Sequence, residues 1–237
     1  MDFENGLKKG FDVWKNNLAA FIVGCIIVLL PFAVVLFITL FITFIAASLF
    51  GSFLLMTGAS LISIAIQFIV AFFVIIPLCF GLIYMAIKGA RDDIVEIKDV
   101  FYSFNSLHGY IRSLIFAAVV LIPFIILNII GMIPFIGFIL LLFYPIIVFV
   151  AAFFLTFAIY IYIMVPSKNL MYAITESFNI AKDNFLITFI LIVVCLILNL
   201  IGAILLGLGL FVTIPVTQIL VALALKELKP DLIDQSH

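Results

Sequence analysis

The chain has 237 residues, of which 68% are hydrophobic and 10% are charged, and its formal net charge is −1. A mean hydropathy of +1.51 excludes an ordinary soluble domain, which could not bury so much apolar surface. The balanced charge indicates neither nucleic acid nor a polyanionic substrate as a partner. The length is therefore best counted in membrane spans of about 20 residues each.

Charged residues are confined to four short windows. All eleven Lys and Arg and all twelve Asp and Glu lie in Asp2–Lys15, Lys88–Arg112, Lys168–Asp183 and Lys226–Asp234. Three uncharged blocks separate these windows, and each is long enough to cross a hydrocarbon core about 30 Å thick twice. The pattern predicts three transmembrane hairpins.

The placement of the basic residues also predicts the orientation of these hairpins. Every Lys and Arg lies at the open ends of the hairpins, and cytoplasmic loops are enriched in these residues. We therefore expect a multi-pass protein of the cell membrane with its N- and C-termini in the cytoplasm. The first apolar stretch is longer than the core of a signal peptide and shows no small-residue cleavage pattern, so a signal peptide is not expected.

Six spans can be placed in chain order within the uncharged blocks. They are Leu18–Phe44, Ser60–Ile87, Ser113–Ile130, Phe138–Val165, Phe185–Ile201 and Leu208–Leu225. Short glycine-rich turns, Gly131–Gly137 and Gly202–Gly209, are predicted on the far side of the second and third hairpins. Residues 46–59 of the first hairpin could extend both helices, lie at the outer interface or re-enter the membrane.

The hairpins share an internal repeat. Asn128 and Asn199 each stand three residues before a glycine, and Pro145 and Pro215 each follow a later glycine by eight residues. Pro77 and Pro215 each precede the next lysine by eleven residues. We predict repeats at about 2–87, 94–165 and 170–228, within one transmembrane domain (1–229) followed by a cytoplasmic tail (230–237).

A segment with helical periodicity precedes each hairpin. Its apolar residues are Phe3, Leu7, Phe11 and Trp14 in the first case, Ile94, Ile97, Phe101, Phe104 and Leu107 in the second, and Leu170, Ile174, Phe178, Ala181 and Phe185 in the third. Steps of three and four residues mark one helix face, and charged residues occupy the others. Each segment is predicted to be an amphipathic helix at the cytoplasmic interface, the alternative being the end of a long span.

These observations predict an all-α polytopic membrane protein in which three hairpin repeats, each preceded by an amphipathic interfacial helix, supply six transmembrane helices. Four aromatic side chains are candidates for contact with the interface: Phe11, Trp14, Phe104 and Phe178.

Several short motifs support a family resemblance. They are Gly81-Leu82-Ile83-Tyr84, Asp99-Val100-Phe101, Ala173-Ile174-Thr175-Glu176-Ser177-Phe178, Gly207-Leu208-Gly209, Ile214-Pro215 and Ala222-Leu223. The last two thirds of the chain resembles a widespread family of uncharacterised six-span prokaryotic membrane proteins. That family is similar to the membrane domain beside some glycerophosphodiester phosphodiesterases. The resemblance implies no catalytic residues, and Val216 stands where the family usually has an aromatic residue.

Residues that could carry chemistry are few. Cys25, Cys79 and Cys195 are isolated in apolar spans, which indicates packing rather than a disulfide framework or a metal site. His108 is interpreted as a solvated interfacial residue, and the run Arg91-Asp92-Asp93 as a solvated loop. No catalytic group, metal ligand or cofactor is predicted, and the protein is not expected to be an enzyme.

The uncharged polar residues within the spans are the remaining candidates. Gln67, Asn128, Asn199 and Gln218 could hydrogen-bond neighbouring helices, which is common in membrane bundles, or could line a substrate path. Pro77, Pro145 and Pro215 are candidate hinges, because an internal proline frees a backbone carbonyl. No charged residue lies within a span, which disfavours proton-coupled transport.

Three functions remain open at this stage. The first is a non-enzymatic membrane protein that handles lipid or another hydrophobic molecule, or supports membrane homeostasis. The second is a transporter or channel for a small neutral solute. The third is an interaction or immunity protein with a membrane protein partner or a second copy of itself.

Overall fold

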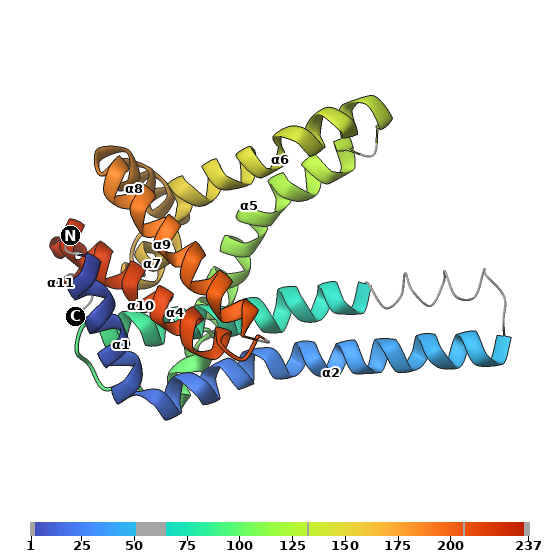
Figure 1. Cartoon of the computed structure of the whole chain (residues 1–237), viewed down its shortest axis with the longest axis horizontal. Helices are drawn as coiled ribbons and strands as arrows, with labels where there is room; N and C mark the ends of the chain where they lie inside the picture. The colour runs from blue at the N-terminus through green and yellow to red at the C-terminus, as the bar shows by residue number, and fades with distance from the viewer. Residues whose placement is uncertain (1–2, 51–64, 132, 206, 235–237) are drawn as a thin grey trace.

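The computed structural model of the chain describes residues 3–131, apart from 51–64, and residues 133–234, apart from 206 (Figure 1). The described residues form helices joined by short turns, which confirms the all-α prediction. The elements are α1 (Phe3–Asn16), α2 (Leu18–Phe50), η1 (Ala71–Ile75), α4 (Ile76–Ala90), η2 (Ile97–Asn105), α5 (Leu107–Gly131), α6 (Pro134–Leu155), α7 (Ala158–Met164), α8 (Leu170–Asp183), α9 (Phe185–Ile204), α10 (Leu210–Leu228) and α11 (Pro230–Asp234).

Among the described residues, six helical segments are long and apolar enough to cross a membrane, as predicted. They are Leu18–Ile42, Ala65–Ala90, Leu107–Gly131, Leu142–Met164, Phe185–Ile204 and Leu210–Leu228. The third span begins at Leu107, six residues before the predicted start at Ser113. The Ser106 hydroxyl caps this helix by accepting a hydrogen bond from the Gly109 N–H. Residues 51–59, whose path the sequence left open, lie outside the described residues.

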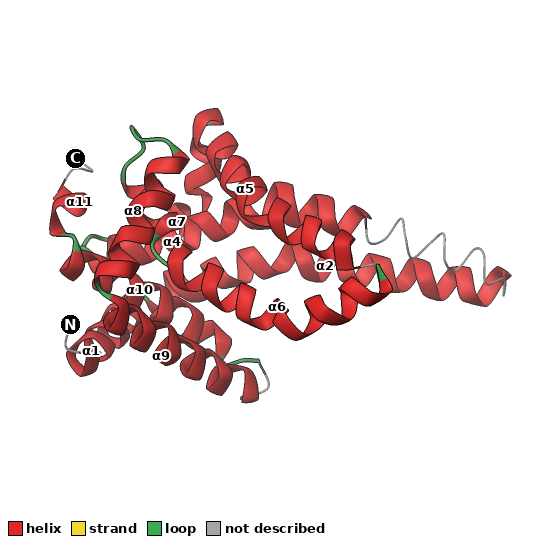
Figure 2. Ribbon diagram, turned by 90° about the horizontal axis from the view of Figure 1, so that it is seen from above, coloured by secondary structure: helices red, strands yellow, loops and turns green. Residues whose placement is uncertain are grey.

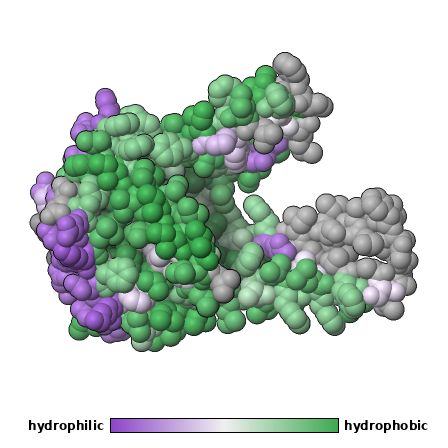
Figure 3. All heavy atoms as spheres, viewed as in Figure 1, coloured by the Kyte–Doolittle hydropathy of each residue, from purple (hydrophilic) through white to green (hydrophobic). Residues whose placement is uncertain are grey.

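The core lies at one end of the molecule, where α4, α7 and α10 pack together. Every residue of α7 except Ile159 is buried, and so are most residues of the C-terminal half of α4 and of the stretch Pro215–Leu225 in α10. Charged residues gather on the outside of this same end, and both ends of the chain lie there (Figures 1, 2 and 3). We refer to it as the charged end.

Two pairs of helices extend from the core as separate arms. One arm contains α2 and the segment that continues through η1 into α4, and the other contains α5 and α6 (Figures 1 and 2). Figure 3 shows that the molecule is hollowed between the arms and that most of the coloured surface of the arms is hydrophobic. The helices of the arms are therefore much less buried than α10.

Three short helices close the charged end. Helix α1 packs against α10, η2 packs against α4, and α8 packs against α6 and α7. The tightest of these contacts is made by Gly81 of α4, because a Cβ atom at this position would lie 1.8 Å from the Val100 carbonyl oxygen of η2. Two of the motifs singled out in the sequence thus meet at this contact.

The η2 segment differs from the predicted single helix. It is a short 3-10 helix with a kink at Phe101, and Leu107 belongs to the next helix. The five apolar residues that were expected to form one face are all exposed, whereas Asp99, Val100 and Ser103 are buried against the protein. The Lys88 side chain draws the polar side of η2 inward, because its Nζ lies 2.8 Å from Asp99 Oδ2.

The fourth span is also not continuous. Helix α6 ends at Leu155 and α7 begins at Ala158, so two residues interrupt the predicted span Phe138–Val165. The buried Ser177 hydroxyl of α8 accepts a hydrogen bond from the Phe157 N–H (3.2 Å) and donates one to the Phe154 carbonyl (2.7 Å). A side chain from a later helix therefore satisfies the backbone groups that the break leaves free.

The first residues of the predicted tail, Pro230–Asp234, form a helix that packs on the rest of the protein. Helix α11 packs against α7, and Leu232 is buried in the core. The predicted domain boundary at residue 229 therefore does not coincide with a loss of packing.

The Gly81–Val100 contact leads to a first prediction. Replacing Gly81 with alanine should lower the thermal stability of the detergent-solubilised protein, because overpacking of this kind costs about 1–3 kcal/mol. Gly10→Ala is the matched control, since its Cβ would lie 3.7 Å from the Val216 carbonyl oxygen, an ordinary contact. Equal melting temperatures for the two variants would contradict the packing of η2 on α4.

A second prediction compares two fully buried serines. Ser177→Ala should destabilise the protein by about 1–3 kcal/mol, because it leaves a backbone N–H and a carbonyl without a partner. Ser103→Ala should have little effect, because the Ser103 hydroxyl is buried without a hydrogen-bond partner. Thermal unfolding of both variants measures the difference, and a larger loss at Ser103 would refute the role given to Ser177.

Candidate functional site

Arg112, near the start of α5, lines two cavities at the charged end. Its guanidinium donates hydrogen bonds to the backbone carbonyls of Tyr162 (2.6 Å), Pro166 and Lys168 (3.3 Å). The same group lies over the Tyr162 ring, with Cζ 4.0 Å from the ring centroid. These bonds attach α5 to the loop between α7 and α8, and they satisfy carbonyls at the C-terminal end of α7.

An open groove of about 610 Å³ runs along one side of Arg112. Its polar part includes His108, Arg112 and Lys168, and its apolar part includes side chains of α5 and the first turn of α8. The full lining is His108, Arg112, Ile115, Val119, Tyr162, Pro166, Ser167, Lys168, Asn169, Leu170 and Met171. The groove is therefore amphipathic along its length.

The polar part of the groove carries positive charge without an acidic partner. Neither Arg112 nor Lys168 forms an ion pair with a described acid, although six other lysine–acid pairs are present among the described residues. The first turn of α8 adds the partial positive charge of a helix N-terminus, with Asn169 as its cap. An anion would be stabilised at this position.

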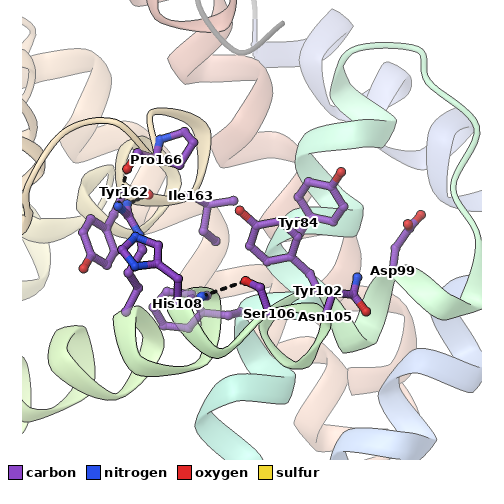
Figure 4. A pocket seen from close by; sticks show the side chains of 12 residues that line it. Tyr84, Asp99, Tyr102, Asn105, Ser106, His108, Tyr162, Ile163 and Pro166 are labelled. Atoms are coloured by element: carbon purple, nitrogen blue, oxygen red, sulfur yellow. Dashed lines mark hydrogen bonds between the residues drawn. The ribbon is translucent and has the colours of Figure 1, made fainter.

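A second cavity of about 320 Å³ is also lined by Arg112. Figure 4 shows Tyr84, Tyr102 and Asn105 on one side of it, facing His108 and Tyr162 on the other. The Tyr84 and Tyr102 rings are stacked, with centroids 4.1 Å apart. Both cavities share His108, Arg112, Tyr162 and Pro166, so they meet at the guanidinium.

The four polar residues predicted within the spans do not gather at one place. The Asn128 amide donates to Phe124 O of its own helix and lies 3.5 Å from the Tyr144 hydroxyl, and the Gln67 amide lies 3.4 Å from Thr39 Oγ1. The remaining contacts are Asn199 Nδ2 with Thr217 Oγ1 (3.3 Å) and the Tyr160 hydroxyl with Gln218 Oε1 (3.0 Å). None of the four lines either cavity beside Arg112.

The three candidate hinge prolines occupy different positions in their helices. Pro77 stands in the first turn of α4, directly after the π-helical turn η1, whereas Pro145 and Pro215 lie inside α6 and α10. Pro31 and Pro123 also lie inside helices, so internal prolines are not restricted to the repeated positions.

The four candidate interfacial aromatics lie at the charged end. Phe11, Phe104 and Phe178 are exposed, and Trp14 is half-buried against the core. Phe11 contacts Trp14 edge to face, and Phe178 stacks on Phe154 of α6. They belong to α1, η2 and α8, and none of them lines the cavities beside Arg112.

Sequence reasoning did not find the Arg112 site. Its partners are backbone carbonyls about 50 residues away, and carbonyls leave no mark in a sequence. One signal was present, because Arg112 is the last charged residue before an uncharged block and His108 stands one helical turn before it.

The described part of the chain contains no group of three or more His, Cys, Asp or Glu that could hold a metal ion. The helices define the class as a multi-pass, all-helical membrane protein. A comparison with protein-family models, curated proteins and solved structures finds no match for this chain.

A third prediction concerns the attachment of α5. Arg112→Met should lower the melting temperature of the solubilised protein, because hydrogen bonds to a charged group contribute about 1.5–3 kcal/mol. Arg112→Lys should recover part of the loss, since a lysine keeps the charge but cannot form the planar fork. Lys98→Gln, a change at an exposed side chain, serves as control; an Arg112→Met variant as stable as this control would refute the anchoring role.

Proposed function

We propose that this protein is a non-enzymatic membrane protein that binds an anionic phospholipid in the groove between α5 and the start of α8. The observation that carries the proposal is the pairing of uncompensated positive charge with an apolar wall in one groove. Arg112 and Lys168 would hold the lipid phosphate, while Ile115, Val119 and Met171 would contact the acyl chains.

The donor inventory of Arg112 supports this role. A guanidinium has five N–H donors, and the three hydrogen bonds to carbonyls leave two of them available to a ligand. The three carbonyls also fix the orientation of the group before a ligand arrives, which lowers the entropic cost of binding. A fixed, forked cation is suited to a phosphate.

The proposed location at a membrane surface has further support. The exposed apolar residues of η2 and the exposed Phe11 and Phe178 would meet the bilayer at its interfacial region, as the proposed interfacial helices require. The concentration of Lys and Arg at the charged end favours a cytoplasmic location for that end and for both termini. Anionic lipids give that leaflet its negative surface potential.

The proposed repeat and family relationship agree with this function. Each short helix, α1, η2 and α8, packs against the second span of a hairpin, as three related units would. The relationship to the membrane domain of glycerophosphodiester phosphodiesterases is also a proposal, and it would associate the chain with phospholipid metabolism. A solute path is less well supported, because the polar residues within the spans bond to their helical neighbours.

A fourth prediction tests the groove with phosphatidic acid, whose headgroup is the phosphate alone. In native mass spectrometry the wild-type protein should retain phosphatidic acid in preference to phosphatidylcholine of the same acyl composition. Lys168→Gln should weaken this binding about five-fold, because a lysine near an anionic lipid contributes about 1 kcal/mol.

The matched control is Lys182→Gln, which removes an exposed lysine from the other end of α8. Phosphatidic acid bound equally well by the two variants would remove Lys168 from the site. A wild-type protein that binds phosphatidylcholine as well as phosphatidic acid would refute the proposed function.

A further inference from the structure

The cavity between Tyr84 and His108 has features that the phosphate site alone does not require. Its volume of about 320 Å³ lies at the lower end of ligand pockets, so it suits a headgroup rather than a whole lipid. It meets the groove at Arg112, which places it next to a phosphate bound there.

The lining of this cavity offers hydrogen-bonding groups without protein partners. Within the described residues, no hydrogen bond involves the hydroxyls of Tyr84 and Tyr102, the Asn105 amide or the His108 imidazole. Phenol and amide groups both donate and accept hydrogen bonds, and so does a ligand hydroxyl. Burial raises the pKa of the Tyr102 phenol, which therefore stays protonated and able to donate at neutral pH.

The charges around the cavity disfavour a cationic ligand group. Arg112 contributes one positive charge, and the carboxylate of Asp99 is already paired with Lys88 at 2.8 Å and accepts the Glu96 N–H. The environment is thus net positive although Asp99 lies in the lining.

We propose that this cavity, which we call the headgroup pocket, receives an uncharged, hydroxylated headgroup substituent of the lipid whose phosphate is held at Arg112. The inference rests on the proposed lipid site and adds its selectivity. A lipid of the phosphatidylglycerol type would place its glycerol hydroxyls among Tyr84, Tyr102 and Asn105. Phosphatidic acid would leave the pocket empty, and phosphatidylethanolamine would bring an ammonium group toward Arg112.

The test is a native mass-spectrometry titration of the wild-type chain with phosphatidylglycerol, phosphatidic acid, phosphatidylethanolamine and, as reference, phosphatidylcholine, all of identical acyl composition. We expect phosphatidylglycerol to bind about five-fold more tightly than phosphatidic acid, as one added hydrogen bond allows. Phosphatidylethanolamine should bind more weakly than either. Equal binding of phosphatidylglycerol and phosphatidic acid would overturn the headgroup pocket and leave the phosphate site intact, whereas loss of both relative to phosphatidylcholine would overturn the two proposals together.

Two conservative variants localise the selectivity. Tyr102→Phe keeps the ring stack on Tyr84 but removes a hydroxyl, and Asn105→Ala changes an exposed residue whose side chain forms no hydrogen bond with another described residue. Each should reduce the preference for phosphatidylglycerol over phosphatidic acid without changing the binding of phosphatidic acid. Tyr172→Phe removes a hydroxyl outside both cavities and should change neither. Unaltered selectivity in Tyr102→Phe and Asn105→Ala would overturn the assignment.

A final arm separates a lipid from a soluble ligand of the same chemistry. Glycerophosphoglycerol, the deacylated headgroup of phosphatidylglycerol, is added as competitor. We expect no displacement at concentrations equal to those of the lipid, because the apolar part of the groove contributes only to an acylated ligand. Equal competition would overturn the lipid as the source and assign the pocket to a soluble phosphodiester.

Discussion

The packing of α4, α7 and α10 at the charged end is the constraint on which the other elements depend. The buried core is composed mainly of residues from these three helices, and the short helices α1, η2 and α8 are positioned by contact with them. Small residues such as Gly81 allow backbones to approach closely, as in other membrane bundles. The Arg112 site is a product of this core, because its three carbonyl acceptors belong to the end of α7 and the loop that follows.

Away from the core, hydrogen bonds between helices replace buried apolar area as the specific contacts. Hydrocarbon chains solvate apolar side chains as well as another helix does, so van der Waals packing and polar pairs decide which helices associate. The Asn199–Thr217 and Tyr160–Gln218 contacts join α9 and α7 to α10 in this way. The arms carry similar contacts, Gln67 with Thr39 and Asn128 with Tyr144, but few of their described residues are buried.

The sequence was sufficient to predict the six spans, because charge-free blocks longer than two membrane crossings leave few alternatives. It was not sufficient where a distant side chain replaces a local backbone bond. The break before α7 is stable because Ser177, twenty residues later, bonds Phe157 N. The outward apolar side of η2 follows from the Lys88–Asp99 pair, which periodicity could not reveal. The sequence shows an arginine at position 112, but it does not show which backbone carbonyls this arginine binds.

The contact between α1 and α10 has a consequence for biosynthesis. Helix α1 emerges from the ribosome before the six spans described here, whereas its main packing partner, α10, is the last of the six to be made. At about 5–20 residues per second, the roughly 200 residues between them take tens of seconds to translate at the slower rate. During that interval α1 has only its smaller contacts with α2 and α4, such as Val13 against Gly89, and the membrane surface or a chaperone would have to shelter the side that later packs on α10. Completion of the charged end is therefore a late event in folding, after all six spans have entered the bilayer.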